Sequence, residues 1–478
     1  MTVKADLIAS LVRQEFDKLP AKRKPVVRDN GLREWVPLSG IVAEEKDGKL
    51  ICLSLATGMK CLPSSRLPQA QGNVLHDWHA EVLAIRAFNC FVLDECRALA
   101  SGSKSSSPFI RQRGSAEMNS SPDHVGDECD EDEKEGNWHG QSFAWREDVS
   151  LHMYCSEAPC GDASMELTMA SQADATPWDI PSQQNPSTPT TVEPEALLPG
   201  RAYFSQLGIV RRKPSRGDAP PTLSKSCSDK LSLHQCTSLL SSVTSLLVSP
   251  EHAYISTLVL PVAQYSASGC RRAFSDGRSR NKKEGDTNQR QEEARMAPLA
   301  TQAQGDGGYA FRPFSVETTD LEFVFSRRSA ALSLTHPPSS CVHKIKITPS
   351  NISTAHTASN RTETTLNGVL QGRKASAADI RGASFASRRK MWSLAVEVAG
   401  LLALNQSSQS DELSILHIRE ALGVAGIGEE EKEAKTGLTY AQVKNCASLG
   451  PRRRAKEVAR REALRGWVRN TGDEDFVL

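Results

Sequence analysis

Two short motifs contain residue types that can hold a metal ion and transfer protons. His79 and Glu81, separated by one alanine, stand at the start of a predicted helix, and Cys160 follows a predicted strand between a proline and a glycine. Zn²⁺ in catalytic sites takes three protein ligands and keeps a fourth position open. A carboxylate beside that position, but not bound to the metal, can take up and return protons. His79 is therefore a candidate ligand and Glu81 a candidate proton carrier.

The third ligand does not stand where a short cysteine motif would put it. Three residues after Cys160 the chain has Ala163, so this ligand must come from elsewhere. Cys155 sits in the strand pattern, where a small buried hydrophobe is its usual role. Cys227 starts a predicted helix within Ser-Cys-Ser-Asp-Lys, and a helix N-terminus lowers a thiol's pKa toward the ligating thiolate. Cys160 is expected to occupy a similar helix start. We therefore predict His79, Cys160 and Cys227 as metal ligands.

Each of these motifs is a weak signal by itself. A histidine followed two residues later by a glutamate is more often part of a surface helix than of an active site. A lone Pro-Cys-Gly is no stronger. Their combination favours a functional site, because each half has the flanking strand or helix that a zinc deaminase requires.

The elements that must position these residues alternate between strand and helix patterns. Residues 38–61 alternate short apolar runs with turn residues, which predicts a strand hairpin. Residues 80–91 are almost continuously apolar and predict a helix buried against a sheet. Residues 151–155 predict a short strand, and 158–165 predict the turn and helix start that follow. This alternation predicts an α/β fold.

The 478-residue chain is long enough for two or three domains, or for one large domain with insertions. Three stretches have compositions that would not bury a core and are predicted to be disordered insertions, at 101–147, 167–200 and 271–308. The net charge of +1 shows no global basic surplus, so a nucleic-acid-binding surface would have to be local.

The N-terminus and the cysteines bear on the compartment. The twelve cysteines lie far apart in a chain without a secretory signal, which favours reduced thiols or metal ligands over disulfides. Residues 1–37 are predicted to be a helical extension packed on the main domain, because apolar residues recur there at helical spacing. No apolar run reaches membrane-spanning length. We expect an intracellular protein of the nucleus or cytoplasm, neither secreted nor bound to a membrane.

At these motifs the sequence resembles the adenosine deaminases acting on RNA, above all the branch that modifies alanine tRNA in eukaryotes. The segments that carry the resemblance are 57–61 (TGMKC), 77–83 (DWHAEVL), 156–163 (SEAPCGDA) and 225–231 (KSCSDKL). The resemblance implies one deaminase domain over 38–478. Its core would be cytidine-deaminase-like, a central sheet with zinc-bearing helices, extended by a C-terminal helical part. No dedicated double-stranded-RNA-binding domain is expected, because the deaminase pattern begins near residue 38.

The activity implied by the resemblance is zinc-dependent hydrolytic deamination of adenosine to inosine in tRNA. The expected target is the adenosine immediately 3′ of the anticodon of alanine tRNA, in a loop whose bases unstack at low cost. A deaminase of free nucleosides or nucleotides is an alternative, disfavoured by the remote Cys227 and the additional basic elements. A catalytically silent zinc module that binds RNA is a second alternative, disfavoured by the intact Glu81.

The resemblance also implies an enclosed inositol hexakisphosphate, which would neutralise buried cations that cost several kcal/mol each when unpaired. Ile85 and Leu233 stand where relatives carry arginine, and the basic run 452–456 leaves the choice of ligand open. The matching positions are Arg86, Lys230, Lys374, Tyr440, Lys444 and Trp467.

Phosphate contacts to RNA are expected from basic residues near the motifs. Lys60 matches an RNA-contacting lysine of the family. A basic cluster precedes the Cys227 motif and would lie at the lip of the pocket, although a solvated loop is an equal interpretation. The cluster consists of Arg211, Arg212, Lys213 and Arg216.

Overall fold

The computed structural model describes most of the chain, and the fold is built from these parts. The described residues are 3–28, 32–119, 138–172, 176, 205–213, 219–278, 294–301, 305–335, 346–373, 379–404, 409–424 and 437–478. Two predicted site residues, Arg216 and Lys374, lie outside them, as do parts of the three predicted insertions.

A mixed eight-stranded sheet forms the centre of the molecule, in the order β13-β12-β11-β3-β2-β6-β8-β9. The pairs β6/β8 and β8/β9 are parallel, and the other neighbours are antiparallel. The predicted hairpin at 38–61 is confirmed as β2 and β3. The strands are β2 (Leu38–Glu44), β3 (Leu50–Thr57), β6 (Ser150–Cys155), β8 (Ile255–Pro261), β9 (Ser315–Thr319), β11 (Ile352–Thr357), β12 (Thr362–Leu366) and β13 (Val369–Leu370).

Helices and two small sheets surround this sheet, so the predicted α/β class is confirmed. The α-helices are α1 (Val3–Asp17), α2 (Ala80–Ala100), α3 (Ser115–Asn119), α5 (Met165–Ala170), α6 (Cys227–Thr237), α7 (Ala267–Phe274), α8 (Arg327–Thr335), α9 (Arg388–Leu404), α10 (Gln409–Leu422), α11 (Tyr440–Asn445) and α12 (Gly450–Glu462). The small sheets pair β1 (Leu32–Trp35) with β10 (Lys346–Pro349), and β5 (Phe143–Trp145) with β4 (Ile110–Gln112) and β7 (Val248–Ser249).

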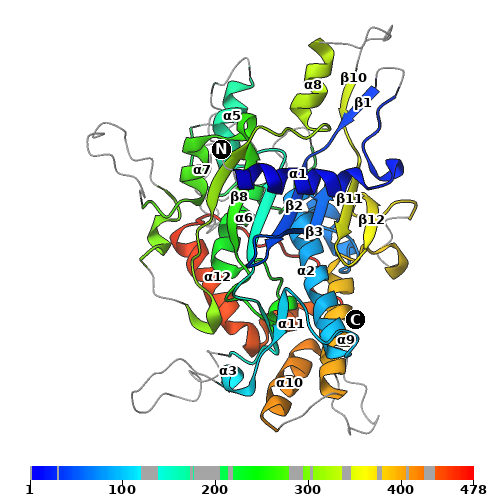
Figure 1. Ribbon diagram of the computed structural model, residues 1–478, viewed down its shortest axis with the longest axis vertical. Helices are drawn as coiled ribbons and strands as arrows, with labels where there is room; N and C mark the ends of the chain where they lie inside the picture. The colour runs from blue at the N-terminus through cyan, green and yellow to red at the C-terminus, as the bar shows by residue number, and fades with distance from the viewer. Residues whose placement is uncertain are drawn as a thin grey trace, which may run out of the picture.

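Side chains alternate between the two faces of the sheet, and each face is covered by a helix. On β2, Ile41 and Ala43 belong to the large core that contains α2, whereas Leu38 and Val42 belong to the smaller core that contains α1. Figure 1 shows α1 lying across the sheet. The period-2 pattern of a strand with two buried faces therefore places α2, and with it His79 and Glu81, on one defined side.

The C-terminal helices complete the large core and pack against α2 and α6. Helix α9 runs beside α2, and α12 packs against α6 (Figure 1). Near the chain end, Tyr440 and Phe476 stack with ring centroids 5.1 Å apart, and both contact Trp392. These contacts bring α11 and the last residues of the chain onto α9.

The predicted insertions extend too far at several ends. Phe143 and Trp145 are fully buried in β5, inside the predicted insertion 101–147. Likewise Phe274 and Met296 are buried, although both fall in the predicted insertion 271–308. The overall composition of each stretch is polar, so it does not reveal these short apolar clusters. The clusters become buried only because segments distant in the sequence cover them. The start of 167–200 overlaps α5, which ends at Ala170.

Within the described residues, no helix combines the length and the apolar composition needed to cross a bilayer.

Candidate metal centre and active site

The first turn of α2 places His79 and Glu81. His79 is the residue before the helix, with extended backbone angles, and its amide donates to Asp77 Oδ1 at 3.0 Å. The chain before it is held to the segment after β3, because Trp78 N donates to Lys60 O at 3.0 Å and Cys61 forms a β-bridge with Asp77. Helix α2 extends to Ala100, beyond the predicted residue 91, and Glu81 is buried on its inner side.

Cys227 is the first residue of α6, as predicted. Ser226 caps this helix, accepting a hydrogen bond from Asp229 N at 3.1 Å. The helix start is joined to the Cys160 loop: Ser228 N donates to Cys160 O at 3.0 Å and Ser228 Oγ to Pro159 O at 3.0 Å. Two segments far apart in the sequence thus meet at their cysteines.

The expectation that Cys160 also opens a helix is wrong. The next residue, Gly161, has a φ of 106°, which interrupts the chain before a single 3-10 turn at Asp162–Ser164. Helix α5 begins only at Met165. A Cβ on Gly161 would lie 2.2 Å from Ser226 Oγ, so the glycine permits both this backbone conformation and the approach of α6. The Cys160 thiol therefore comes from a tight loop.

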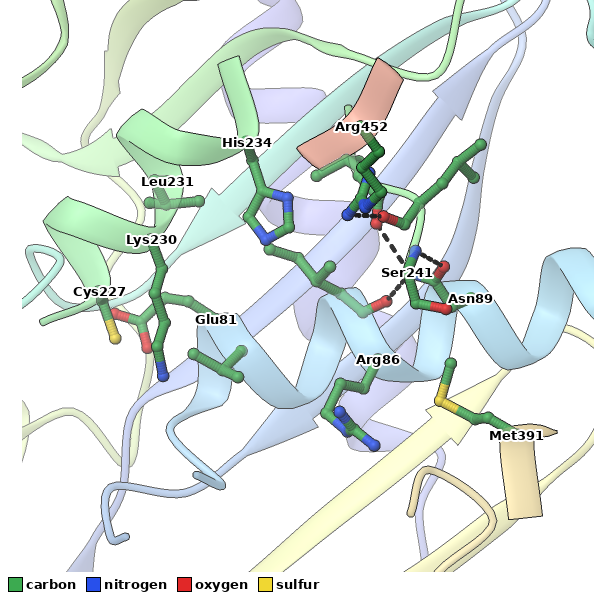
Figure 2. Close-up of a pocket in the computed structure, with 14 residues that line it drawn as sticks. Glu81, Arg86, Asn89, Cys227, Lys230, Leu231, His234, Ser241, Met391 and Arg452 are labelled. Atoms are coloured by element: carbon green, nitrogen blue, oxygen red, sulfur yellow. Dashed lines mark hydrogen bonds between the residues drawn. The ribbon is translucent and has the colours of Figure 1, made fainter. Parts of the chain in front are cut away.

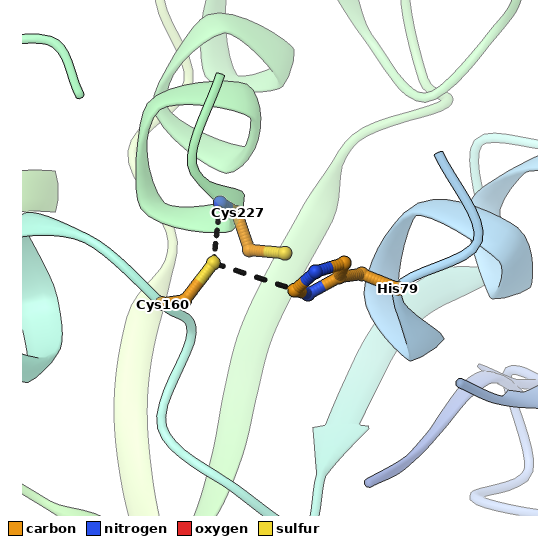
Figure 3. A group of neighbouring side chains, drawn as sticks. All are labelled: His79, Cys160 and Cys227. Carbon is orange, nitrogen blue, oxygen red and sulfur yellow. Dashed lines mark hydrogen bonds between the residues drawn. The ribbon is translucent and has the colours of Figure 1, made fainter. Parts of the chain in front are cut away.

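The three predicted ligands come together (Figure 3). One ligand atom of each of His79, Cys160 and Cys227 lies within 4.8 Å of the others, and Cys160 Sγ is 3.9 Å from His79 Nδ1. Tetrahedral zinc with its usual bond lengths separates its ligand atoms by roughly 3.5–3.8 Å. The donor set and its spacing therefore fit zinc. Cys155 is absent from this group and receives a hydrogen bond from Ser39 Oγ at 3.4 Å, in the strand.

A second potential metal-binding group shares His79. Cys61 and Asp77, together with His79, also place ligand atoms within 4.8 Å of one another. Sequence reasoning assigned no role to either residue, although both lie in the segments that carry the family resemblance. Their contact depends on the β-bridge between the two loops, which is a long-range feature.

Charges around Cys160 favour its thiolate, whereas burial and the Cys160 charge raise the pKa of Cys227. The pKa of Cys160 lies well below its usual range because the Cys227 thiol hydrogen-bonds to it and Lys213 and His79 add positive charge, against the effect of burial. Burial and the Cys160 charge raise the pKa of Glu81. A carboxyl with a raised pKa is suited to both accepting and donating a proton near neutral pH.

A buried carboxylate, Asp77, connects two lysines to the ligands. Its Oδ2 accepts from Lys213 Nζ at 2.8 Å, from Ser224 Oγ at 2.5 Å and from Lys230 Nζ. Lys213 Nζ also lies 3.2 Å from Cys227 Sγ. Burial opposes ionisation of Asp77, but Lys213, Lys230 and His79 hold its pKa well below the usual range. The carboxylate balances the lysines, and Lys213 places a positive charge beside the two cysteine sulfurs, which lowers the pKa of Cys160.

The predicted phosphate-contacting residues differ in exposure. Arg211 and Lys213 are buried, and the Arg211 amide donates to Asp229 Oδ2 at 2.9 Å. Neither side chain is therefore presented to an RNA backbone at the surface. Lys60 and Arg212 are partly exposed, and Lys60 Nζ donates to Asn351 Oδ1.

A cavity of about 160 Å³ adjoins Glu81 and is lined by cations. Figure 2 shows Glu81, Cys227 and Lys230 at one end and Arg452 at the other, with Arg86 between them. Both arginines donate to carbonyls: Arg86 Nε to Ala386 O at 2.6 Å, and Arg452 to Thr237 O and Leu240 O, each at 2.6 Å. Glu81 is the one acidic residue among the described lining residues.

Helix α12 carries the basic run 452–456 and turns its members to different faces. Arg452, Lys456 and Arg460 follow at four-residue steps, so they share one helix face. The pKa of Lys456 lies well below its usual range because of burial and the charges of Arg452, Lys444 and Arg460. Arg453 instead donates to Cys446 O at 2.6 Å, and Arg454 pairs with Asp306 at the surface. The four-residue period was visible in the sequence, but the buried face was not.

Three other predicted anion ligands, Tyr440, Lys444 and Trp467, contact charged side chains. Lys444 pairs with Glu474 at 2.7 Å and lies over the Tyr440 ring. Arg460 and Lys225 both contact the Trp467 ring, at 5.4 and 5.6 Å. Sequence reasoning missed His234, another lining residue, whose pKa falls to about 4 through burial and the charges of Arg452, Lys456 and Lys230.

Comparisons with known proteins agree with this chemistry. The family described as "Adenosine-deaminase (editase) domain" matches residues 54–124 and 131–471. A tRNA-specific adenosine deaminase 1 from Schizosaccharomyces pombe is 37% identical over 325 residues, which is 67% of this chain and 70% of the relative. Proteins of that name from Saccharomyces cerevisiae and Drosophila melanogaster are 35% and 28% identical, over 49% and 52% of this chain and 52% and 53% of their own lengths.

Proposed function

Since this chain belongs to the adenosine-deaminase (editase) domain family, we propose that it converts adenosine to inosine in tRNA by zinc-dependent hydrolysis. The observation that carries the proposal is the position of Glu81, buried beside a histidine and two cysteines whose spacing fits zinc. The core would be cytidine-deaminase-like, with α2 and α6 presenting ligands at their first turns. A purely structural zinc site has no use for this glutamate.

His79, Cys160 and Cys227 would hold the zinc, which when bound supplies Lewis-acid activation of water. Glu81 takes the proton of the water that attacks C6 of adenine. It delivers that proton to the adjacent ring nitrogen. Glu81 then takes the remaining proton of the former water from the new C6 hydroxyl and delivers it to the amine, so the C6–N bond breaks and ammonia leaves. Lys213 contacts the Cys227 sulfur, where it would stabilise the charge of a zinc-bound thiolate, and Asp77 holds Lys213.

The proposed substrate is the adenosine immediately 3′ of the anticodon of alanine tRNA. The name of two of the similar relatives, tRNA-specific adenosine deaminase 1, supports a tRNA substrate. A loop base reaches a buried site more readily than a stacked base in a duplex. Lys60 and Arg212, both partly exposed near the ligand loops, are proposed to contact phosphates.

Incubation of the full-length protein with alanine tRNA, a long RNA duplex and free adenosine tests this proposal. We expect inosine, read by sequencing, at the adenosine next to the anticodon of alanine tRNA and little elsewhere. Inosine formed mainly from free adenosine would support a nucleoside deaminase instead. RNA binding without inosine in any substrate would support a silent zinc module and would overturn the proposal.

We further propose that the cationic cavity encloses inositol hexakisphosphate. The supporting observation is the positive charge beside the cavity. Arg452, which lines it, leaves its buried Nε without a hydrogen bond, and the partly buried Lys456, one turn further along α12, has no carboxylate partner among the described residues. Each such group costs several kcal/mol without a counter-charge. The row Arg452, Lys456 and Arg460 is longer than a single phosphate needs and suits a polyanion.

Replacing Lys456 with glutamine is expected to weaken this binding. Wild-type protein should retain phosphorus after purification, and added inositol hexakisphosphate should raise its Tm, since a ligand at 100 times Kd stabilises by about 2.7 kcal/mol. The variant should retain less phosphorus and show a smaller shift. Arg454→Gln, on the exposed face of the same helix, is the control and should match wild type. No bound phosphorus and no Tm shift in wild type would contradict the proposal.

A further inference from the structure

Two buried arginines pair with aspartates that lie two residues after the two cysteines, Arg272 with Asp162 and Arg295 with Asp229. Arg272 belongs to α7 and Arg295 to the segment 294–301, and both lie in a stretch that composition assigned to an insertion. We propose that they form a brace that sets the positions of Cys160 and Cys227. The inference rests on the proposed function, since it takes these cysteines to be metal ligands.

Arg272 holds the Cys160 loop. Its Nε lies 3.1 Å from both carboxylate oxygens of Asp162, and its Nη2 donates to Asp162 O at 3.0 Å. Asp162, two residues after Cys160, is fully buried and also accepts from Gly208 N at 2.9 Å. The other end of the arginine fork pairs with Glu166 at 2.7 Å. One guanidinium therefore holds the whole turn that carries the thiol.

Arg295 holds the start of α6 in the same way. Its Nη1 donates to Asp229 Oδ1 at 2.6 Å and its Nη2 to Ser232 Oγ at 2.8 Å. Asp229, two residues after Cys227, is fully buried, and its other oxygen receives the Arg211 amide. Each cysteine is thus followed at the same spacing by a buried aspartate that faces one arginine.

The two arginines are joined to each other. Arg295 N donates to Arg272 O at 3.1 Å, and Arg295 Nε donates to Ala273 O at 3.1 Å. Helix α7 also approaches the Cys160 loop closely, since a Cβ on Gly269 would lie 2.7 Å from Ala163 O. A single unit therefore fixes the separation of the two thiols, which a metal site requires within a few tenths of an ångström.

The geometry assigns a positioning role, because neither arginine lies in the group of ligand atoms. Arginine presents several donors in a rigid fork, whereas lysine offers a flexible point charge. Replacing either with lysine keeps the buried charge and removes the fork. Changes to the groups that orient metal ligands usually cost about 10- to 100-fold in metal affinity or activity.

The test compares Arg272→Lys and Arg295→Lys with wild type in the full-length, zinc-loaded protein. We expect zinc release to a chromogenic chelator to become about 10- to 100-fold faster in each variant. Alkylation with iodoacetamide, mapped by mass spectrometry, should rise at Cys160 in the first variant and at Cys227 in the second. The thiolate absorption bands of the cobalt-substituted protein should shift in both.

Arg361→Lys is the matched control. Arg361 forms a forked ion pair with the buried Asp94 on α2, outside the ligand group, so its replacement removes a comparable contact. It should lower Tm without changing zinc release, alkylation or the cobalt spectrum. If a lysine variant does not fold, the double variant Asp229→Asn/Arg295→Gln keeps a neutral hydrogen-bonding pair and is measured in its place.

The outcomes separate the two proposals. Zinc release within twofold of wild type in every folded variant would overturn the brace while leaving the metal site intact. Zinc release that accelerates equally in Arg361→Lys would also overturn it, because the effect would then reflect stability alone. A wild-type protein that takes up no zinc would overturn the proposed function itself.

Discussion

Replacement of Glu81 with glutamine should abolish turnover while leaving the metal in place. Glutamine keeps the size and hydrogen-bonding capacity of the buried side chain but cannot carry a proton. General acid–base groups contribute about 10²- to 10⁴-fold, and a residue used for several transfers stands at the upper end of that range. The measurement is single-turnover inosine formation in alanine tRNA, together with zinc content by mass spectrometry.

Glu95→Gln is the control for this variant. Glu95 is equally buried on the same helix and pairs with Lys104 at 2.6 Å, well along α2 from His79. Its replacement should leave inosine formation near the wild-type rate. An active Glu81→Gln enzyme would remove the proton carrier from the mechanism. Loss of zinc in that variant would instead show that Glu81 is needed for metal binding.

Replacement of Cys227 with alanine should remove both zinc and activity. The variant leaves only His79 and Cys160 of the group, and two ligands do not hold zinc in a catalytic site. Lys213 also loses its contact with the Cys227 sulfur and keeps its ion pair with Asp77. Zinc content per chain should fall to near zero, and inosine formation should become undetectable.

Cys155→Ala tests whether this loss is specific to the third ligand. Cys155 stands closer to Cys160 in the sequence, yet its side chain faces Ser39 within the sheet. The variant should keep its zinc and its activity, with a modest loss of stability for a small buried side chain. If Cys155→Ala lost its zinc and Cys227→Ala kept it, Cys155 would be the third ligand and Cys227 would not.

The agreement between sequence and structure is best where a signal is local. The start of α6 at Cys227 and the start of α2 after His79 were predictable from helix-start patterns over a few residues. The hairpin β2–β3 was equally predictable from alternation. The helix start predicted at Cys160 was wrong. Gly161 has a positive φ and allows the close approach of α6, and this long-range contact is not visible in the residues next to Cys160.

The amino-acid sequence by itself determined the α/β class and the residue types of the candidate ligands and of the proposed proton carrier, because periodicity, capping and chemical identity reside in short stretches. The tertiary structure alone decided what surrounds them. It paired Asp77 with Lys213 and put Arg452 and Lys456 on one face of α12. It also paired Arg272 and Arg295 with the aspartates that follow the two cysteines. Those contacts join segments tens to hundreds of residues apart, and burial of charge depends on which segments meet. The three candidate ligands are residues of suitable type in the sequence, and the fold surrounds them with charged and hydrogen-bonding groups.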